Sequence, residues 1–402
     1  MALGTGMSIK VHHSIIHGFE KESKKDVGNV QKTKVLLDSD AQHVKSLVHG
    51  VAALFGRRGN SQDWGRFGND GRQGPFPARF DAFIANAADG ANFLDMSHTI
   101  LDEVTGLANK QQWATGGNVL CALYEFVEDI EPEAPPLPDD GPGDVVVASE
   151  PDWQGHVGEL FLLVAMVKQK SGLSLDKNLV PIGISEVDMS KLHQAALIHV
   201  NEYHKVKALP PPEEGEDDLH DRIYLSFVAQ RANRSSTYFV NALGCVIGLT
   251  PAQATKKLFT AVDAFFTERK EIQKYRREAK ELLAKHLQDA AVENRVVTID
   301  RLHEVLIRAV PEELGAHVAD ITEYLNDVKR KVPASFQPST RALARFANVV
   351  LNGEGYQVRF ERTLLGKDAN SDFHYNKEQK TLTIRNLGKS LTDKLDGVLA
   401  GD

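Results

Sequence analysis

The sequence predicts an α+β protein with an N-terminal antiparallel sheet and flanking helices, then a mainly helical region and a small C-terminal β segment. In the first 230 residues, short apolar runs typical of strands alternate with stretches rich in Pro, Gly and Asp. From about residue 250, apolar residues recur at helical spacing. The order of elements does not repeat strand, helix, strand, as a parallel sheet would require, so an antiparallel sheet is favoured.

The predicted elements divide the chain into four parts. These are a leader or disordered segment at 1–8, an α+β domain at 9–249, a helical domain at 250–335 and a small α/β segment at 336–402. Three stretches of the second part are dominated by Gly, Pro and charged residues and are expected to be mobile loops. They cover 56–77, 131–151 and 210–221.

Within the α+β domain, helical apolar spacing predicts helices over 38–55 and 79–107. Short apolar runs predict strands over 118–130 and 156–168, which we expect to pair antiparallel. Further strands are expected at 196–203 and 223–228.

The helical domain begins at Thr250, where a hydroxyl cap, a proline and Gln253 form a capping-box pattern. The helix that it opens is expected to run to about Asp289. Further helices are predicted near 298–309, 311–328 and 339–351. A β segment is predicted at 357–362, 372–375 and 381–385, and a turn at 376–379 closes its last pair.

Charge separates the two halves of the chain. The net charge is −8, but residues 1–222 hold 20 Lys and Arg against 33 Asp and Glu, whereas residues 223–402 hold 27 against 22. The second half is therefore at +5 and the first at −13. Because phosphate attraction is local and screened, an acidic half does not exclude a basic DNA-binding face on the other.

The expected helix after Thr250 carries the clearest basic row. Lys270, Lys274 and Arg277 stand at i, i+4 and i+7, where like charges repel, and an anionic partner would offset that cost. Neighbouring glutamates leave an ordinary solvated face as an equal alternative. Shorter clusters are predicted to contribute further phosphate contacts; they are Lys256, Lys257, Lys329, Arg330 and Lys331.

Two other segments could contact nucleic acid. Arg231 and Arg234 precede hydroxyl residues at an expected helix start, where free N–H groups favour a phosphate, although Ser235 could equally be a plain N-cap. The stretch 56–77 holds four arginines among glycines, with Trp64 and Phe67 available to stack on bases. Its arginines are Arg57, Arg58, Arg66 and Arg72. A solvated insertion explains this stretch equally well.

The sequence lacks the motifs for catalysis, metal binding and cofactor binding that were considered. Both Gly-Lys pairs lack the glycine that a phosphate-binding loop requires, and the two cysteines lie in apolar runs. The histidines near residue 12 have no acidic or Cys partner at metal-ligand spacing. Glu361, Asp372 and Lys380 loosely resemble a nuclease centre on neighbouring strands. We therefore expect no cofactor, no metal and no catalytic residue, with a metal-dependent nuclease or phage-defence component as the alternative.

No run of eighteen apolar residues and no secretory signal pattern occurs, which predicts a cytoplasmic protein without a membrane span.

An ordered set of short segments carries a family resemblance. It comprises Gly117–Cys121, Glu159–Ala165, Leu175–Asp176, Tyr224–Phe227, Tyr238–Phe239, Leu243–Cys245 and Thr381–Ile384. From about residue 9 to 396 the chain resembles the bacterial 37-kDa nucleoid-associated protein family. It departs from the family at Ala229-Gln230, where Lys-Gly is frequent, and in longer stretches at 56–77 and 131–151.

The resemblance implies a protein of the nucleoid that binds DNA without strong sequence preference and contacts topoisomerases. Our primary hypothesis is a non-enzymatic, homodimeric DNA-binding protein of chromosome organisation. A third hypothesis is an adaptor whose acidic half binds a topoisomerase.

Overall fold

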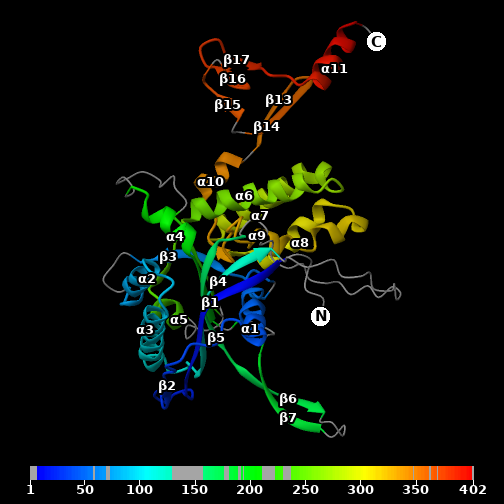
Figure 1. Ribbon diagram of the computed structural model, residues 1–402. Helices are drawn as coiled ribbons and strands as arrows, with labels where there is room; N and C mark the ends of the chain where they lie inside the picture. Colours follow the sequence, from blue (N-terminus) through cyan, green and yellow to red (C-terminus); the bar gives the residue numbers. More distant parts are fainter. Residues whose placement is uncertain are drawn as a thin grey trace.

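An eight-stranded antiparallel sheet organises the first 250 residues (Figure 1). The structure is a computed structural model, and it describes residues 7–400 except 58, 69–72, 129–156, 176–180, 189–191, 193, 211–221, 230–236, 347, 362–363 and 369. The strand order is β10-β3-β9-β8-β5-β4-β1-β2. In chain order the strands are β1 Met7–Phe19, β2 Val30–Gln31, β3 Asp63–Phe67, β4 Gly117–Glu128, β5 Leu160–Val167, β8 Gln194–His199, β9 Leu225–Ala229 and β10 Cys245–Ile247.

The central strands are buried on both faces, which explains their unbroken apolar runs. In β4, Cys121 and Leu123 belong to one core cluster, while Leu120 and Tyr124 belong to another across the sheet. The predicted antiparallel pairing of β4 with β5 is confirmed, with Cys121 opposite Val164. A sheet covered on both faces needs no polar alternation.

Helices cover the two faces unequally. Three helices pack on one face together with α4, which is described below, and one packs on the other (Figure 1). The first set is α2 Phe76–Ile84, α3 Gly90–Asn109 and α5 Thr237–Ala242, and the single helix is α1 Gln42–Ala52. The prediction of one helix over 79–107 was wrong, because a turn separates α2 from α3. Asp89 caps α3 by accepting from the Ala91 N–H at 2.9 Å, and the turn lets Phe83 and Phe93 meet edge to face.

The predicted strand 196–203 ends at His199, and α4 Val200–Lys207 follows it. The helical turn brings the ring of Tyr203 against Tyr224 and Phe80, at 4.9 Å and 5.2 Å between centroids. Aromatic packing against the neighbouring strand and α2 therefore overrides the apolar run that predicted a strand.

The stretch 56–77 is not a mobile loop where the structure describes it, because β3 lies inside the sheet between β9 and β10. Trp64 is 3% exposed and Phe67 is 5% exposed. Gly65 is required there, since a Cβ atom would meet the Val246 carbonyl oxygen of β10 at 2.1 Å. The other two predicted loops, 131–151 and 210–221, lie outside the described residues apart from Pro210. A separate hairpin, β6 Gln169–Leu175 with β7 Pro181–Val187, projects from the sheet (Figure 1).

The helical domain forms around its own core. Its elements are α6 Pro251–Glu268, η3 Gln273–Tyr275, α7 Arg276–Val292, β11 Val297–Thr298, η4 Ile299–Arg301, α8 Leu302–Leu306, η5 Ile307–Ala309, η6 Glu312–Val318, α9 Ile321–Leu325, β12 Ser335–Phe336 and α10 Thr340–Phe346. The predicted capping box is confirmed, with both Thr250–Gln253 bonds present. The ring of Phe346 stacks on Phe259 at 4.3 Å, so α10 completes this core.

A buried amide joins the helical domain to the sheet. The Gln62 N–H donates to Asn326 Oδ1 at 2.6 Å, and Asn326 Nδ2 donates to the carbonyls of Gln62 and Val332 at 2.8 Å and 2.7 Å. Asn326 is fully buried. Lys331 adds a second link by donating to the Ile223 carbonyl at 3.1 Å.

The last part of the chain, residues 348–400 and hereafter the C-terminal module, follows α10 (Figure 1). It consists of β13 Asn348–Gly353, β14 Tyr356–Glu361, β15 Leu365–Gly366, β16 Phe373–Asn376, β17 Thr381–Ile384 and α11 Lys389–Ala400. The predicted helix 339–351 was wrong beyond Phe346, because the following residues pair with β14 as a hairpin. The turn at 376–379 is confirmed, and Asn376 Oδ1 accepts from the Glu378 N–H at 3.0 Å. The helix α11 was not predicted.

None of the described helices is long and apolar enough to cross a membrane.

Candidate nucleic-acid interface

The predicted basic row on one long helix was wrong, because the helix ends at Glu268 and restarts at Arg276. Lys270 lies in the turn between α6 and α7, and Ile272 in the same turn is fully buried. The turn folds α7 back on α6, so that both helices contribute to one core.

Arg269 holds this turn in place. It leaves helical geometry at φ −109° and ψ 102°, and its guanidinium lies 3.5 Å from the ring centroid of Phe265. It also pairs with Asp320 at 2.6 Å. The aromatic ring and the carboxylate together hold the guanidinium of Arg269 in one position.

The three residues of the predicted row therefore have different surroundings. Arg277 pairs with Glu281 at 3.0 Å along α7, as in an ordinary solvated helix face. The Lys274 ammonium lies 5.0 Å from the ring centroid of Tyr275. Lys270 and Lys274 are both exposed.

The cluster at 329–331 is partly structural. Arg330 pairs with Glu268 at 3.1 Å and lies over the ring of Tyr324 at 4.2 Å. Lys331 bonds the sheet, as described above, so only Lys329 is exposed.

Glu268 joins the turn after α6 to the segment 329–331, because it is the last residue of α6 and pairs with Arg330. We call the three exposed lysines of these segments and the neighbouring paired arginines the turn cluster; it consists of Lys270, Lys274, Lys329, Arg269, Arg276 and Arg330. The acidic residues bonded to arginines at this end of the domain are Asp263, Glu268 and Asp320. The three lysines make no ion pair with the residues that the structure describes, although Glu271 is exposed beside them.

Lys256 and Lys257 lie at the other end of α6. Twelve residues of helix, at 1.5 Å each, separate Lys256 from the end of α6 by about 18 Å. Lys256 is exposed and Lys257 is half-buried. These two lysines are therefore not part of the turn cluster.

The arginines of 56–77 do not form a stacking loop with Trp64 and Phe67, because both aromatic side chains are buried in the cores of the sheet. Arg57 and Arg66 are half-buried. Arg58, Arg72, Arg231 and Arg234 lie outside the described residues.

A second basic cluster was missed by sequence analysis. Arg295, Arg301 and Arg308 lie near His286 of α7. Burial, and then these three arginines, lower the pKa of His286, while Asp289 acts in the opposite sense. We call these four residues the His286 cluster. Arg301 and Arg308 are exposed, and Arg295 pairs with Glu293. The residues are scattered over more than twenty positions, so no spacing in the sequence indicates the cluster.

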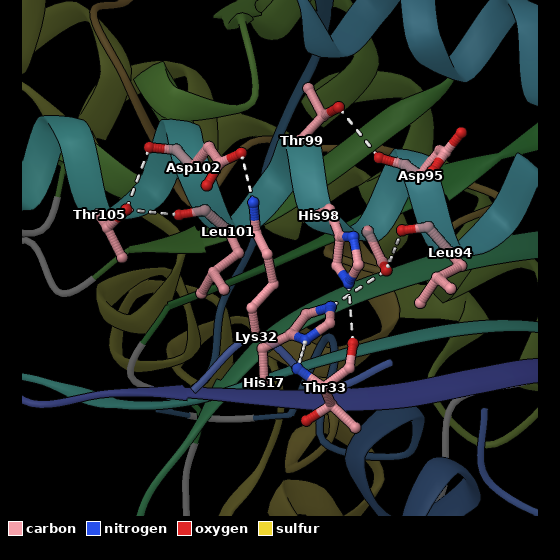
Figure 2. A network of polar contacts seen from close by, with 11 residues as sticks. His17, Lys32, Thr33, Leu94, Asp95, His98, Thr99, Leu101, Asp102 and Thr105 are labelled. Atoms are coloured by element: carbon pink, nitrogen blue, oxygen red, sulfur yellow. Dashed lines mark hydrogen bonds and ion pairs between the residues drawn. The ribbon is translucent and has the colours of Figure 1, made fainter. Parts of the chain in front are cut away.

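Of the histidines near the N-terminus, His17 has a structural role (Figure 2). The Thr33 N–H donates to His17 Nδ1 at 3.1 Å, and Ser97 donates its hydroxyl to the Leu94 carbonyl at 2.7 Å. His17 Nε2 must then donate to Ser97 Oγ, 3.0 Å away, which requires a neutral imidazole. Burial, and to a smaller extent His98, lower the pKa of His17 to about 4. Among the described residues, no group of three or more His, Cys, Asp or Glu is placed to hold a metal ion.

Of the three residues of the nuclease alternative, Glu361 lies on a different sheet, whereas Asp372 and Lys380 precede the neighbouring strands β16 and β17. Glu361 ends β14, which pairs with β13, whereas Asp372 immediately precedes β16. Asp372 Oδ1 accepts from Asn386 Nδ2 at 2.6 Å. Lys380 is exposed in the turn before β17, with φ +54°.

Comparison with known proteins identifies the family. The model of the family described as nucleoid-associated protein YejK matches residues 15–392. A nucleoid-associated protein of Pseudomonas aeruginosa is 23% identical over 387 residues, covering 96% of this chain and 97% of its own. One of Azotobacter vinelandii is 22% identical over 386 residues, with 96% and 97% covered. These matches confirm the resemblance noted in the sequence. The chain belongs to the family of the nucleoid-associated protein YejK.

Proposed function

We propose that this protein binds DNA in the bacterial nucleoid, largely without sequence preference, through the turn cluster of the helical domain. The observation that supports this most directly is the convergence of Lys270, Lys274 and Lys329 at one end of that domain. Lysines placed this way can neutralise phosphates without reading bases.

The His286 cluster extends the proposed contact along α7. Lys274 and His286 are twelve residues apart, or about 18 Å along a helix. That length corresponds to about five base pairs of duplex DNA at 3.4 Å each. Arginine is well suited to the phosphate contact at the His286 cluster, because its guanidinium can donate two parallel hydrogen bonds to one phosphate group.

The test is a salt-resolved affinity measurement on a duplex of random sequence. Each phosphate contact contributes about 0.9 to the slope of log affinity against log salt. Replacing Lys270, Lys274 and Lys329 by alanine should reduce the slope by about 3 and weaken all sequences equally.

A matched control removes the same charge from the acidic half through Lys24, Lys34 and Lys110, which are exposed. An unchanged slope in the turn-cluster variant, or an equal loss in the control, would reject this surface. Replacing Arg301 and Arg308 tests the second cluster in the same way.

We propose that the function is binding and not catalysis. The carboxylate of Asp372 accepts a hydrogen bond from Asn386, and Asp372 precedes a strand of a different sheet from that of Glu361. Plasmid incubated with the protein and Mg²⁺ or Mn²⁺ should remain supercoiled. Nicking that disappears in an Asp372→Asn variant would favour the nuclease alternative.

We also propose that a second copy of the chain is a partner, and that a topoisomerase contacts the acidic half. The topoisomerase contact should survive nuclease treatment in a pull-down, whereas simple co-residence on DNA should not.

A further inference from the structure

Exposed apolar side chains are concentrated in the C-terminal module. Of the eighteen large apolar side chains that are exposed among the described residues, eleven lie between positions 351 and 399. Monomeric soluble proteins rarely expose apolar patches larger than a few hundred Å², so this concentration indicates a contact surface.

One apolar surface is a face of the small sheet β15-β16-β17. Leu365 pairs with Phe373, and Phe373 pairs with Ile384, so these three residues share one face. Tyr375 lies two residues beyond Phe373 on the same face. Phe360 of β14 stacks on Phe373 at 3.9 Å, whereas Leu365, Tyr375 and Ile384 remain 38–44% exposed.

The second apolar surface is a stripe along α11. Leu391, Leu395, Val398 and Leu399 fall within about 100° of one another around the helix axis. They are 47–85% exposed, and no residue of α11 is buried. A lone helix of this length is marginal in water, and Gly397 within it costs about 1 kcal/mol more. The helix therefore needs a tertiary contact that the single chain does not supply among its described residues.

We propose that a second copy of this chain supplies that contact, with α11 of each copy covering the apolar sheet face of the other. Within one chain α11 points away from the sheet (Figure 1). If two copies are related by a two-fold axis, each α11 covers the sheet face of the other copy, so that both helix stripes and both sheet faces are buried.

The exposed area is sufficient for a stable dimer. The seven exposed side chains of these two surfaces, roughly half exposed on average, present on the order of 700 Å² of apolar area per copy. A standard stable interface buries about 800 Å² per partner, of which roughly 60% is apolar. This proposal rests on the self-association proposed above and places it on the C-terminal module. The dimer contact does not involve DNA, so it can be tested without nucleic acid, separately from DNA binding.

The first test is the molar mass of the full-length protein, by light scattering and sedimentation, for wild type, Leu395→Asp and Ser390→Asp. Ser390 is exposed on the far side of α11, five residues or about 140° from Leu395. The wild type and Ser390→Asp should be dimers, and Leu395→Asp should raise the dimer dissociation constant at least about tenfold. A monomeric wild type, or a dimer unaffected by Leu395→Asp, would overturn the proposal.

The second test is disulfide formation between Ile384→Cys and Leu395→Cys chains. The native Cys121 and Cys245 are buried and do not compete. A mixture of the two variants should give a cross-linked dimer, and each variant alone should not. Two outcomes count against the helix-on-sheet contact. One is a cross-link within a monomer carrying both substitutions, and the other is a cross-link between two Leu395→Cys chains.

Discussion

Replacing Asn326 by alanine should loosen the helical domain from the sheet. Asn326 is fully buried, and its side chain makes three hydrogen bonds, two to Gln62 and one to Val332. The Ala334 N–H also donates to the Gln62 carbonyl at 3.1 Å, so that carbonyl keeps a partner in the variant. The Gln62 N–H and the Val332 carbonyl would lose theirs.

The expected magnitude follows from these two groups. A buried polar group that loses its partner costs about 1–3 kcal/mol. Two such groups lower the free energy of unfolding by about 2–6 kcal/mol, which is a large fraction of the stability of a typical domain. Asn352→Ala is a suitable control, because Asn352 is exposed and accepts one bond, from Gln357. Its cost should stay near 0.5 kcal/mol.

Urea unfolding can be followed by two probes that report different parts of the chain. All three tryptophans lie before residue 223, so their fluorescence reports the sheet half, whereas far-UV circular dichroism includes the helical domain. In Asn326→Ala the transition seen by circular dichroism should move to lower urea and separate from the fluorescence transition. If both midpoints stay at the wild-type values, or shift no more than in Asn352→Ala, the buried amide does not couple the domains.

Two further predictions concern buried titratable groups. The pKa of His17 is about 4 in the folded state against an ordinary value of 6.5, so the unfolded chain binds more protons between those values. Stability from His17 should be complete above pH 6.5 and fall by about 3 kcal/mol as pH drops toward 4, and His17→Gln should flatten that part of the profile in urea titrations. Burial raises the pKa of Cys121 to about 12 and raises that of Cys245 as well. Both thiols should therefore resist a thiol reagent until the protein unfolds, and rapid labelling of the native protein would show that the sheet opens.

Local chemistry made several elements predictable. Thr250 and Gln253 satisfy two of the free N–H groups at the start of α6 through each other, so the helix start could be read from four residues. The apolar runs of β4 and β5 could be read as a pair, because both strands are buried on both faces. The turn at 376–379 depends on Asn376 bonding its own neighbours.

Long-range packing decided the elements that were misread. Asp63–Phe67 contains glycine and two charged residues, and it forms a strand because β9 and β10 flank it on either side. The row from Lys270 to Arg277 has helical spacing, but burial of Ile272 and the contacts of Arg269 with Phe265 and Asp320 turn the chain there.

For the candidate site too, some features follow from the sequence and others only from the tertiary structure. By itself the sequence determined the family, the α+β class and the excess of positive charge in the second half, because these depend on composition and on residues close together in the chain. Only the tertiary structure decided which cations share a surface. Glu268 joins Lys270 to the segment of Lys329, and the fold gathers three distant arginines around His286. Electrostatic attraction acts over distance in space, and spacing along the chain sets that distance only within a single helix or strand.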